Sequence, residues 1–182
     1  ENNKKNWNPE GEPGKYDEVI IRKVSGVKKY PDLNNIGHKI DIYSLTIESG
    51  TKITAAETTT LKNDRFFVTD FIKNYGTFET LYFPLTLRKG DFTNAGTLKN
   101  GQTLTIEKGS LINSGTIENS GMIKIGGDLN NSGTISNTLN VSGSVILNAG
   151  SISGTINAIN NNSEGKNKFT VNETQDLQNV SI

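Results

Sequence analysis

Few residues in this 182-residue sequence could carry catalytic chemistry. The only histidine, His38, could serve as a general base. The aspartates of the first half that could form paired carboxylates are Asp41, Asp64, Asp70 and Asp91. No regular spacing predicts that they converge. The chain has no cysteine, which excludes disulfides, thiolate metal ligands and cysteine nucleophiles. We therefore expect no catalytic, cofactor or metal site, and a protein that is not an enzyme.

The charge and hydropathy of the chain exclude two classes of partner. The 19 basic and 19 acidic residues give a formal net charge of zero, whereas nucleic-acid binding depends on clustered Lys and Arg. The longest purely apolar runs are three or four residues, far short of the roughly 20 that span a bilayer. We expect neither nucleic-acid binding nor membrane insertion. Because the first residue is Glu1 and not Met, we also expect a mature, secreted chain after signal removal.

A six-residue step runs through the second half of the chain. From Thr93 to Lys168 there is no aromatic residue, and Asn, Ser, Thr and Gly are abundant. Aliphatic residues nevertheless recur every six positions: Leu111, Ile117, Ile123, Leu129, Ile135, Val141 and Leu147. The same step links Phe92, Leu98 and Leu104, with one extra residue before Leu111. A disordered segment has no reason to keep such a register, so the pattern indicates a repeat.

A longer period is superimposed on this step. The motif Asn-x-Gly-Thr/Ser-aliphatic begins at Asn94, Asn113, Asn131 and Asn148, and its glycines are 19, 18 and 17 residues apart. Three hexads then make one triangular coil of about eighteen residues. We predict an all-β fold, a parallel β-solenoid (β-helix) of about five to six coils with extended N- and C-terminal segments. The predicted coil starts are Leu85, Leu104, Ile123, Leu139 and Ile156, with an earlier coil from Leu45 that resumes at Phe71.

Three regions follow from this pattern. Residues 1–41 are predicted as an extended capping or strand-exchange segment, and residues 161–182 as a tail of the same kind. The solenoid is predicted over 42–160, with an insertion near 54–70 that contains Phe66 and Phe67. Only 32% of the residues are hydrophobic, which fits a narrow core with room for Ile, Leu and Val but little for rings.

The corners of the coil have a distinctive chemistry. Sharp turns often need positive φ, which Gly adopts freely and Asn tolerates, so we expect the Asn-x-Gly corners to use it. Stacked in register, Asn113 and Asn131 are expected to form a side-chain amide ladder. Thr97, Thr116, Thr134 and Ser151 are expected to form a column as well. A flat ice-binding face would need paired Thr columns, and only one is visible.

The repeats resemble those of parallel β-solenoid surface proteins, namely adhesin stalks, filament-forming subunits and viral fibres. The segment from Leu104 to Leu111, LTIEKGSL, is also similar to the repeats of bactofilins, which are triangular solenoids that polymerise end to end. Hexad acyltransferases share the six-residue step, but no histidine lies in the repeats here. The resemblance implies an architecture and no functional residues.

The resemblance and the absence of a substrate site favour a structural role. We expect a non-enzymatic subunit of an extracellular filament or surface layer, with a second copy of the chain as its partner. Assembly would use the solenoid ends and strand exchange through the termini, unless these fold back as caps. The candidate strand-exchange residues are Val19, Ile20, Ile21, Phe169, Val171, Val180 and Ile182.

An adhesin or other binding module is the alternative. The first 92 residues hold 12 of the 13 aromatics, and Trp7, Tyr75 and Tyr82 could stack on a glycan or host surface. If the chain is secreted, Asn-x-Ser/Thr acceptors permit N-glycosylation. They are Asn130, Asn140, Asn161, Asn172 and Asn179, about as many as chance predicts.

Overall fold

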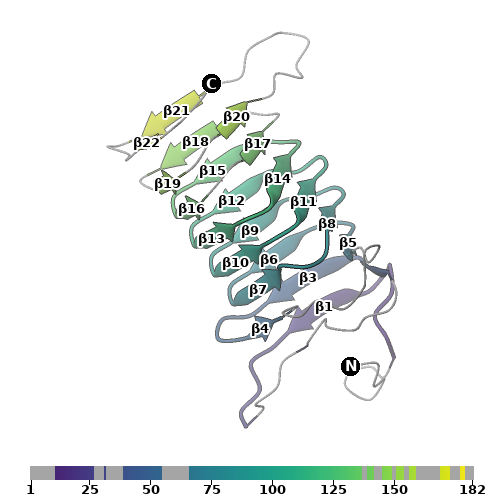
Figure 1. The fold of residues 1–182 in the computed structure, drawn as a ribbon. Helices are drawn as coiled ribbons and strands as arrows, with labels where there is room; N and C mark the ends of the chain where they lie inside the picture. The colour runs from purple at the N-terminus through teal and green to yellow at the C-terminus, as the bar shows by residue number, and fades with distance from the viewer. Residues whose placement is uncertain are drawn as a thin grey trace.

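The computed structural model describes residues 11–26, 31, 39–54, 66–136, 139–141, 145–148, 151–153, 156–158, 169–172 and 177–178. Over these ranges the chain forms 22 strands and no helix, so no membrane-spanning helix occurs in them. Every strand pair is parallel, and the strands form three sheets of seven, eight and seven strands. The predicted parallel β-solenoid is therefore confirmed (Figure 1).

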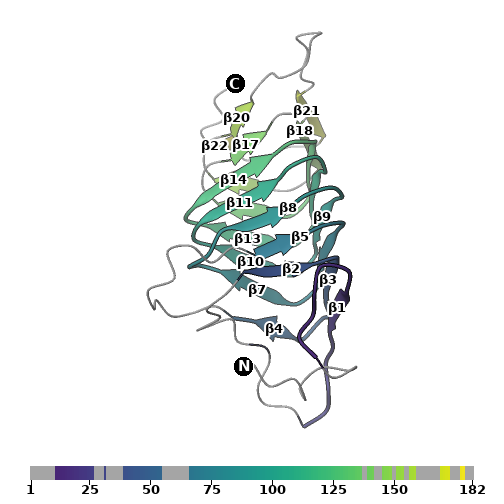
Figure 2. The same ribbon diagram turned by 90° about the vertical axis from the view of Figure 1, so that its right-hand side faces the viewer.

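Each coil contributes one strand to each sheet in turn. Sheet 1 contains β2 (Ile40–Ile42), β5 (Phe66–Val68), β8 (Leu85–Leu87), β11 (Thr103–Ile106), β14 (Met122–Ile125), β17 (Leu139–Val141) and β20 (Ile156–Ala158) (Figure 2). Sheet 2 contains β1 (Glu18–Ile21), β3 (Ser44–Ile47), β6 (Ile72–Asn74), β9 (Phe92–Asn94), β12 (Leu111–Asn113), β15 (Leu129–Asn131), β18 (Val145–Asn148) and β21 (Phe169–Asn172). Sheet 3 contains β4 (Lys52–Ile53), β7 (Thr77–Thr80), β10 (Thr97–Asn100), β13 (Thr116–Asn119), β16 (Thr134–Ser136), β19 (Ser151–Ser153) and β22 (Leu177–Gln178).

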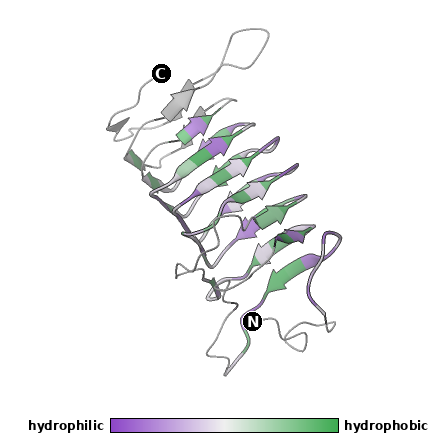
Figure 3. Ribbon diagram, turned by 45° about the vertical axis from the view of Figure 1, so that its right-hand side comes forward, coloured by the Kyte–Doolittle hydropathy of each residue, from purple (hydrophilic) through white to green (hydrophobic). Residues whose placement is uncertain are grey.

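The register of the sheets converts the sequence period into columns of side chains. The five predicted coil starts from Leu85 onward are confirmed, because Leu85, Leu104 and Ile123 lie opposite one another in sheet 1 and are followed by Leu139 and Ile156. The earlier coil predicted from Leu45 and resuming at Phe71 is wrong, because Leu45 lies in sheet 2 opposite Ile72, so the two segments belong to successive coils. The strands alternate between buried and solvent-facing positions. Figure 3 shows hydrophobic and hydrophilic residues along the same strands. One coil thus buries Leu104, Ile106, Leu111 and Ile117, together with two asparagines at its corners, Asn113 and Asn119.

The buried asparagines between sheets 2 and 3 form the predicted ladder. The Nδ2 atoms of Asn74, Asn94 and Asn113 each donate to the Oδ1 of the next asparagine, in Asn94, Asn113 and Asn131, at 2.7 Å. They also donate to backbone carbonyls of the following turn or coil, such as Thr134 O for Asn113. The Oδ1 of Asn74 has no hydrogen-bond partner, because the preceding coil places Ile47 opposite it. The ladder therefore has a direction and ends on an unsatisfied acceptor.

A second polar ladder, which the sequence analysis missed, lies between sheets 3 and 1. The Oγ1 of Thr80 donates to Asn100 Oδ1 at 3.0 Å, and Asn100 Nδ2 donates to Asn119 Oδ1 at 2.8 Å. The Oγ of Ser136 then accepts the backbone N–H of Asn119 at 3.2 Å. These side chains satisfy one another and the turn carbonyls inside a core that would otherwise penalise them.

The corner glycines serve close approach, and the prediction of positive φ is wrong for them. Among the described glycines, positive φ occurs at Gly11, Gly26 and Gly50, and not at Gly96, Gly115 or Gly133 of the Asn-x-Gly motifs. A Cβ on Gly115 would instead lie 2.1 Å from the carbonyl oxygen of Gly96, and one on Gly133 would lie 2.0 Å from that of Gly115. Stacked turns come so close that no side chain fits between them.

The structure differs from the prediction in coil number, in boundaries and in the rings of the core. The described strands form seven coils where about five to six were predicted. Phe66 and Phe67 belong to β5 and not to the insertion, and residues 55–65 lie outside the described residues. The stack also begins earlier and ends later than predicted, since β1 extends sheet 2 and β21 and β22 complete a seventh coil. The early coils accommodate rings, because Phe66, Phe78 and Phe92 are buried, and Phe66 packs edge-on against Phe78.

Candidate functional site

The terminal strand β1 forms the outer edge of sheet 2. It pairs in parallel with β3, with Val19 opposite Leu45 and Ile21 opposite Ile47. Val19 and Ile21 point inward and are buried, so the apolar interior is covered at this end. Directly after β1 and β3, an exposed ion pair links Arg22 to Glu48, whose Nε and Oε1 are 3.7 Å apart. One edge of β1 therefore has no neighbour among the described strands of sheet 2, although its inward-facing side chains are buried.

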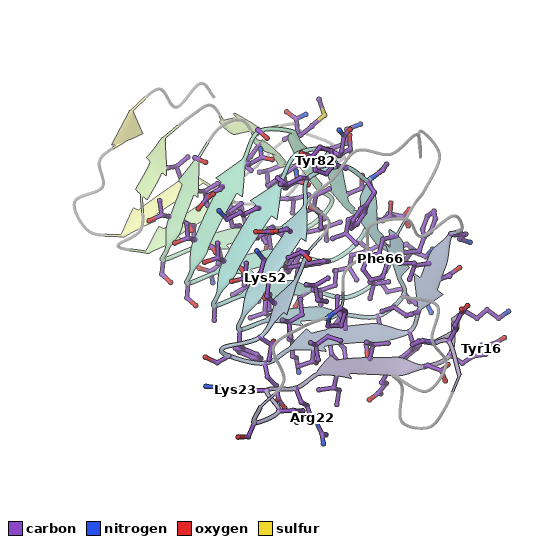
Figure 4. All side chains as sticks on the ribbon, turned by 60° about the horizontal axis from the view of Figure 1, so that its bottom comes forward. Tyr16, Arg22, Lys23, Lys52, Phe66 and Tyr82 are labelled. Atoms are coloured by element: carbon purple, nitrogen blue, oxygen red, sulfur yellow. The ribbon has the colours of Figure 1, made fainter. Side chains whose placement is uncertain are left out.

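Exposed apolar side chains lie on this terminal strand and on the segments directly before and after it. Tyr16, Ile20 and Val24, which we call the terminal apolar row, are 79%, 44% and 55% exposed. Figure 4 shows the strand from this end, with Tyr16 beyond one of its ends and Arg22 and Lys23 beyond the other. An exposed apolar row beside an edge strand is a feature of sites that add a further strand.

The sheet 3 edge at the same end is different. The carbonyl of Pro31 accepts a hydrogen bond from the backbone N–H of Thr54, just after β4, at 3.2 Å. Proline has no N–H of its own to offer a further strand, and natural proteins use it to blunt sheet edges. The contrast leaves β1 as the better candidate for an intermolecular contact at this end.

Two of the four predicted strand-exchange residues of the tail, Phe169 and Val171, lie in the chain's own stack. In β21, Phe169 is opposite Val145 and Val171 is opposite Leu147, and β21 forms the far edge of sheet 2. Val180 and Ile182 lie outside the described residues. Both predicted exchange segments thus supply edge strands of the same sheet.

A cluster of charged side chains links three successive coils on the outer face of sheet 1. Arg88 donates to both carboxylate oxygens of Asp41, at 3.0 and 3.4 Å, and Lys39 Nζ lies 2.8 Å from Asp41 Oδ2. Both cations lie over the ring of Phe67, at 4.5 Å for Arg88 and 4.6 Å for Lys39. Burial by itself raises the pKa of the Asp41 carboxyl, but hydrogen bonds and positive charge from Lys39 and Arg88 outweigh it, so its pKa lies below the ordinary value.

The Asp41→Asn variant is expected to lose about 1 kcal/mol of stability at neutral pH, because the pairing is half-exposed and two cations lose their common anion. A lowered pKa in the folded state gives stability that is present above the unfolded pKa, near pH 4, and lost as the pH falls through the folded pKa. The difference between wild type and Asp41→Asn should therefore shrink in acid. Thermal unfolding between about pH 2 and 7 measures this, with Glu107→Gln, an exposed carboxylate near the same sheet, as control. A constant difference across that range would contradict the pairing.

Two of the predicted glycan contacts, Tyr75 and Tyr82, are exposed and flank β7 at opposite ends. Their stacking on a sugar stays a prediction. Trp7 and His38 lie outside the described residues. A shallow hollow of about 460 Å³ on sheet 1 is lined by Thr105, Met122, Lys124 and Asn140, with no aromatic ring.

The remaining predicted positions are distributed over the surface. Asn130 and Asn140 occupy outward positions of β15 and β17 and are partly exposed, and Asn172 ends β21. Asn161 and Asn179 lie outside the described residues. The Thr97, Thr116, Thr134 and Ser151 column is confirmed, and Thr77 begins it. Its neighbouring column on sheet 3 contains Glu79, Lys99 and Glu118, so the face has no second Thr column.

No group of three His, Cys, Asp or Glu that could hold a metal occurs in the described ranges. Asp91 uses its Oδ1 to accept the backbone N–H of Ser110 at 2.8 Å, a structural contact between coils. No protein-family model matches the chain, and the searches of curated proteins and of solved structures returned no significant match. Its function is therefore argued from its own geometry.

Proposed function

We propose that this chain is a non-enzymatic structural protein, a subunit of an extracellular filament or surface layer that assembles through the ends of its solenoid. The observation that carries the proposal is the single strand direction of sheet 2, from β1 at one edge to β21 at the other. The two edges of a parallel sheet offer complementary N–H and C=O groups. The β21 strand of one copy can thus pair with β1 of the next without reversing a strand.

Such a contact joins two different surfaces of the same chain. A heterologous contact of this kind repeats without closing unless the rotation makes a ring, and so generates a filament. The terminal apolar row supports the proposal, because Ile20 lies on the edge strand, Tyr16 and Val24 flank that strand in the sequence, and all three side chains are exposed. Since Val19 and Ile21 are already buried, the contact would depend on the backbone edge and on this row, and not on opening the core.

Ile20 and Ile112 allow a matched test, because they occupy the same outward column of sheet 2, at its edge and in its middle. Ile20→Lys places a charge on the edge strand and is expected to raise the concentration needed for assembly about tenfold. Ile112→Lys makes the same exchange where both neighbouring strands are already paired and should assemble like wild type. Negative-stain electron microscopy and light scattering over a concentration series measure both.

Wild-type fibres with a regular axial repeat, lost selectively in Ile20→Lys, are the expected result. Equal inhibition by both variants would place the contact on the face of sheet 2 and not at its end. Uniform small particles of wild type at every concentration would contradict assembly. A binding module that uses exposed aromatics such as Tyr82 would then become the leading function, with glycan binding as the next measurement.

A further inference from the structure

Asn100-Gly101 is the only position in the sequence where Gly directly follows Asn. In such a dipeptide the Gly backbone nitrogen can attack the Asn side-chain carbonyl carbon Cγ without obstruction from a side chain. A C–N bond forms and the Cγ–Nδ2 bond breaks. The Gly N–H proton is transferred to the departing nitrogen, which leaves as ammonia, and a cyclic succinimide remains. Water then opens either carbonyl of the ring, giving aspartate or isoaspartate. The reaction needs no oxidant or cofactor, only access and conformational freedom.

The fold requires both residues of this dipeptide. Asn100 is a central member of the second polar ladder, where it accepts from Thr80 and donates to Asn119. Gly101 is required by close approach, since a Cβ there would lie 2.4 Å from the carbonyl oxygen of Leu81 in the preceding coil. Neither residue can be exchanged for a less reactive one without breaking a contact between coils.

The same contacts hold the reacting atoms in place. The Asn100 side chain is completely buried, and its Nδ2 also donates to Gln102 O at 2.8 Å. The attacking nitrogen, that of Gly101, donates to Thr80 O at 3.4 Å. Cyclisation would require the Asn100 amide to leave the ladder, and hydrolysis would require water at a buried position. We infer that Asn100-Gly101 is a latent deamidation site, inert in the folded solenoid and reactive once this coil opens.

The product cannot return to the ladder. In aspartate, a carboxylate oxygen replaces the Nδ2 that faces two acceptors, Asn119 Oδ1 and Gln102 O. Two oxygens would then oppose each other at a position without solvent, where an unpaired charge is strongly disfavoured. In isoaspartate, the backbone gains a methylene and the following strand β11 loses its register. Deamidation of the unfolded chain therefore makes unfolding irreversible.

The test compares the wild-type protein in native buffer and in urea, at one mildly alkaline pH and temperature. Peptide mapping by mass spectrometry follows deamidation at Asn100, with Asn113-Ser114 and Asn119-Ser120 in the same digest as internal references. Conversion at Asn100 is expected to be about 100-fold slower in the native sample, because only molecules with this coil open can react. The refolded fraction should fall in step with the converted fraction.

Two results would overturn the inference. One is conversion of Asn100 at similar rates in native buffer and in urea. The other is recovery of the wild-type denaturation midpoint by chains shown to carry aspartate or isoaspartate at position 100. The Asn100→Asp variant, produced directly, supplies an independent measurement of the aspartate product. Its midpoint should lie well below that of wild type, and an unchanged midpoint would contradict the argument.

Discussion

The Asn113→Ala variant is expected to lose about 3 kcal/mol of unfolding free energy, the combined effect of a buried cavity and of two lost ladder hydrogen bonds. Asn113 accepts from Asn94 Nδ2 and donates to Asn131 Oδ1, both at 2.7 Å, and it is buried. Truncation leaves Asn94 Nδ2 with only its longer contacts to the carbonyls of Gly96 and Thr116, at 3.3 and 3.2 Å, and removes the side-chain donor to Asn131 Oδ1. Urea denaturation of the purified protein measures the loss.

Three comparisons isolate the ladder from the general effect of a substitution. Ser114→Ala changes the exposed neighbouring position and should alter stability by less than about 0.5 kcal/mol. Asn74→Ala removes one ladder bond, not two, because its Oδ1 is already unsatisfied, and should cost less than Asn113→Ala. Asn113→Asp places a carboxylate against Asn131 Oδ1, so its cost should decrease in acid. Equal midpoints for Asn113→Ala and Ser114→Ala would contradict this account.

The Gly115→Ala variant is expected to cost more than about 4 kcal/mol and to prevent folding in warm solution, because the added methyl group meets backbone and not a flexible side chain. The Cβ would lie 2.1 Å from Gly96 O, and the coils cannot separate locally since Thr116 N donates to that same oxygen at 2.9 Å. Circular dichroism and thermal unfolding report whether the solenoid forms.

Gly26→Ala is the matched control for this effect. Gly26 has a φ of +80°, but a Cβ there would meet nothing within 4 Å. Its substitution should cost only about 1 kcal/mol, from the backbone conformation alone. If the two variants cost the same, the close approach of stacked turns at Gly115 would add no measurable penalty, and this account of the corner motif would be contradicted.

The part of the fold that could be predicted from sequence is the part where stacking is regular. Leu111, Ile117 and Ile123 are buried at successive positions of three sheets, as the six-residue step predicts. The step is informative because every coil repeats the same cross-section, so a sequence period becomes a spatial column. Phe66 and Phe67 were misplaced because the segment before β5 interrupts that period.

Other features could not be predicted, because they depend on distances between coils that the sequence repeat does not contain. Asn100 and Asn119 recur 19 residues apart, and this spacing could have indicated the second ladder, but which face of a short strand is inward depends on where its turn falls. The regular spacing of the glycines can be read from the sequence. Its cause, the close approach of the backbones of stacked turns, cannot. Asp41 and Arg88 are 47 residues apart and meet across two coil boundaries, so no local pattern relates them.

The hydrogen bonds of the three sheets run along the stacking axis, and this has a mechanical consequence. A pull on the two ends along that axis loads the coil boundaries in series, so that the weakest boundary yields while the others hold. One coil, with 19 residues between Thr97 and Thr116, would release about 60 Å of extended chain in place of the roughly 4.8 Å that it occupied. Under tension the solenoid would lengthen in discrete steps and dissipate load coil by coil.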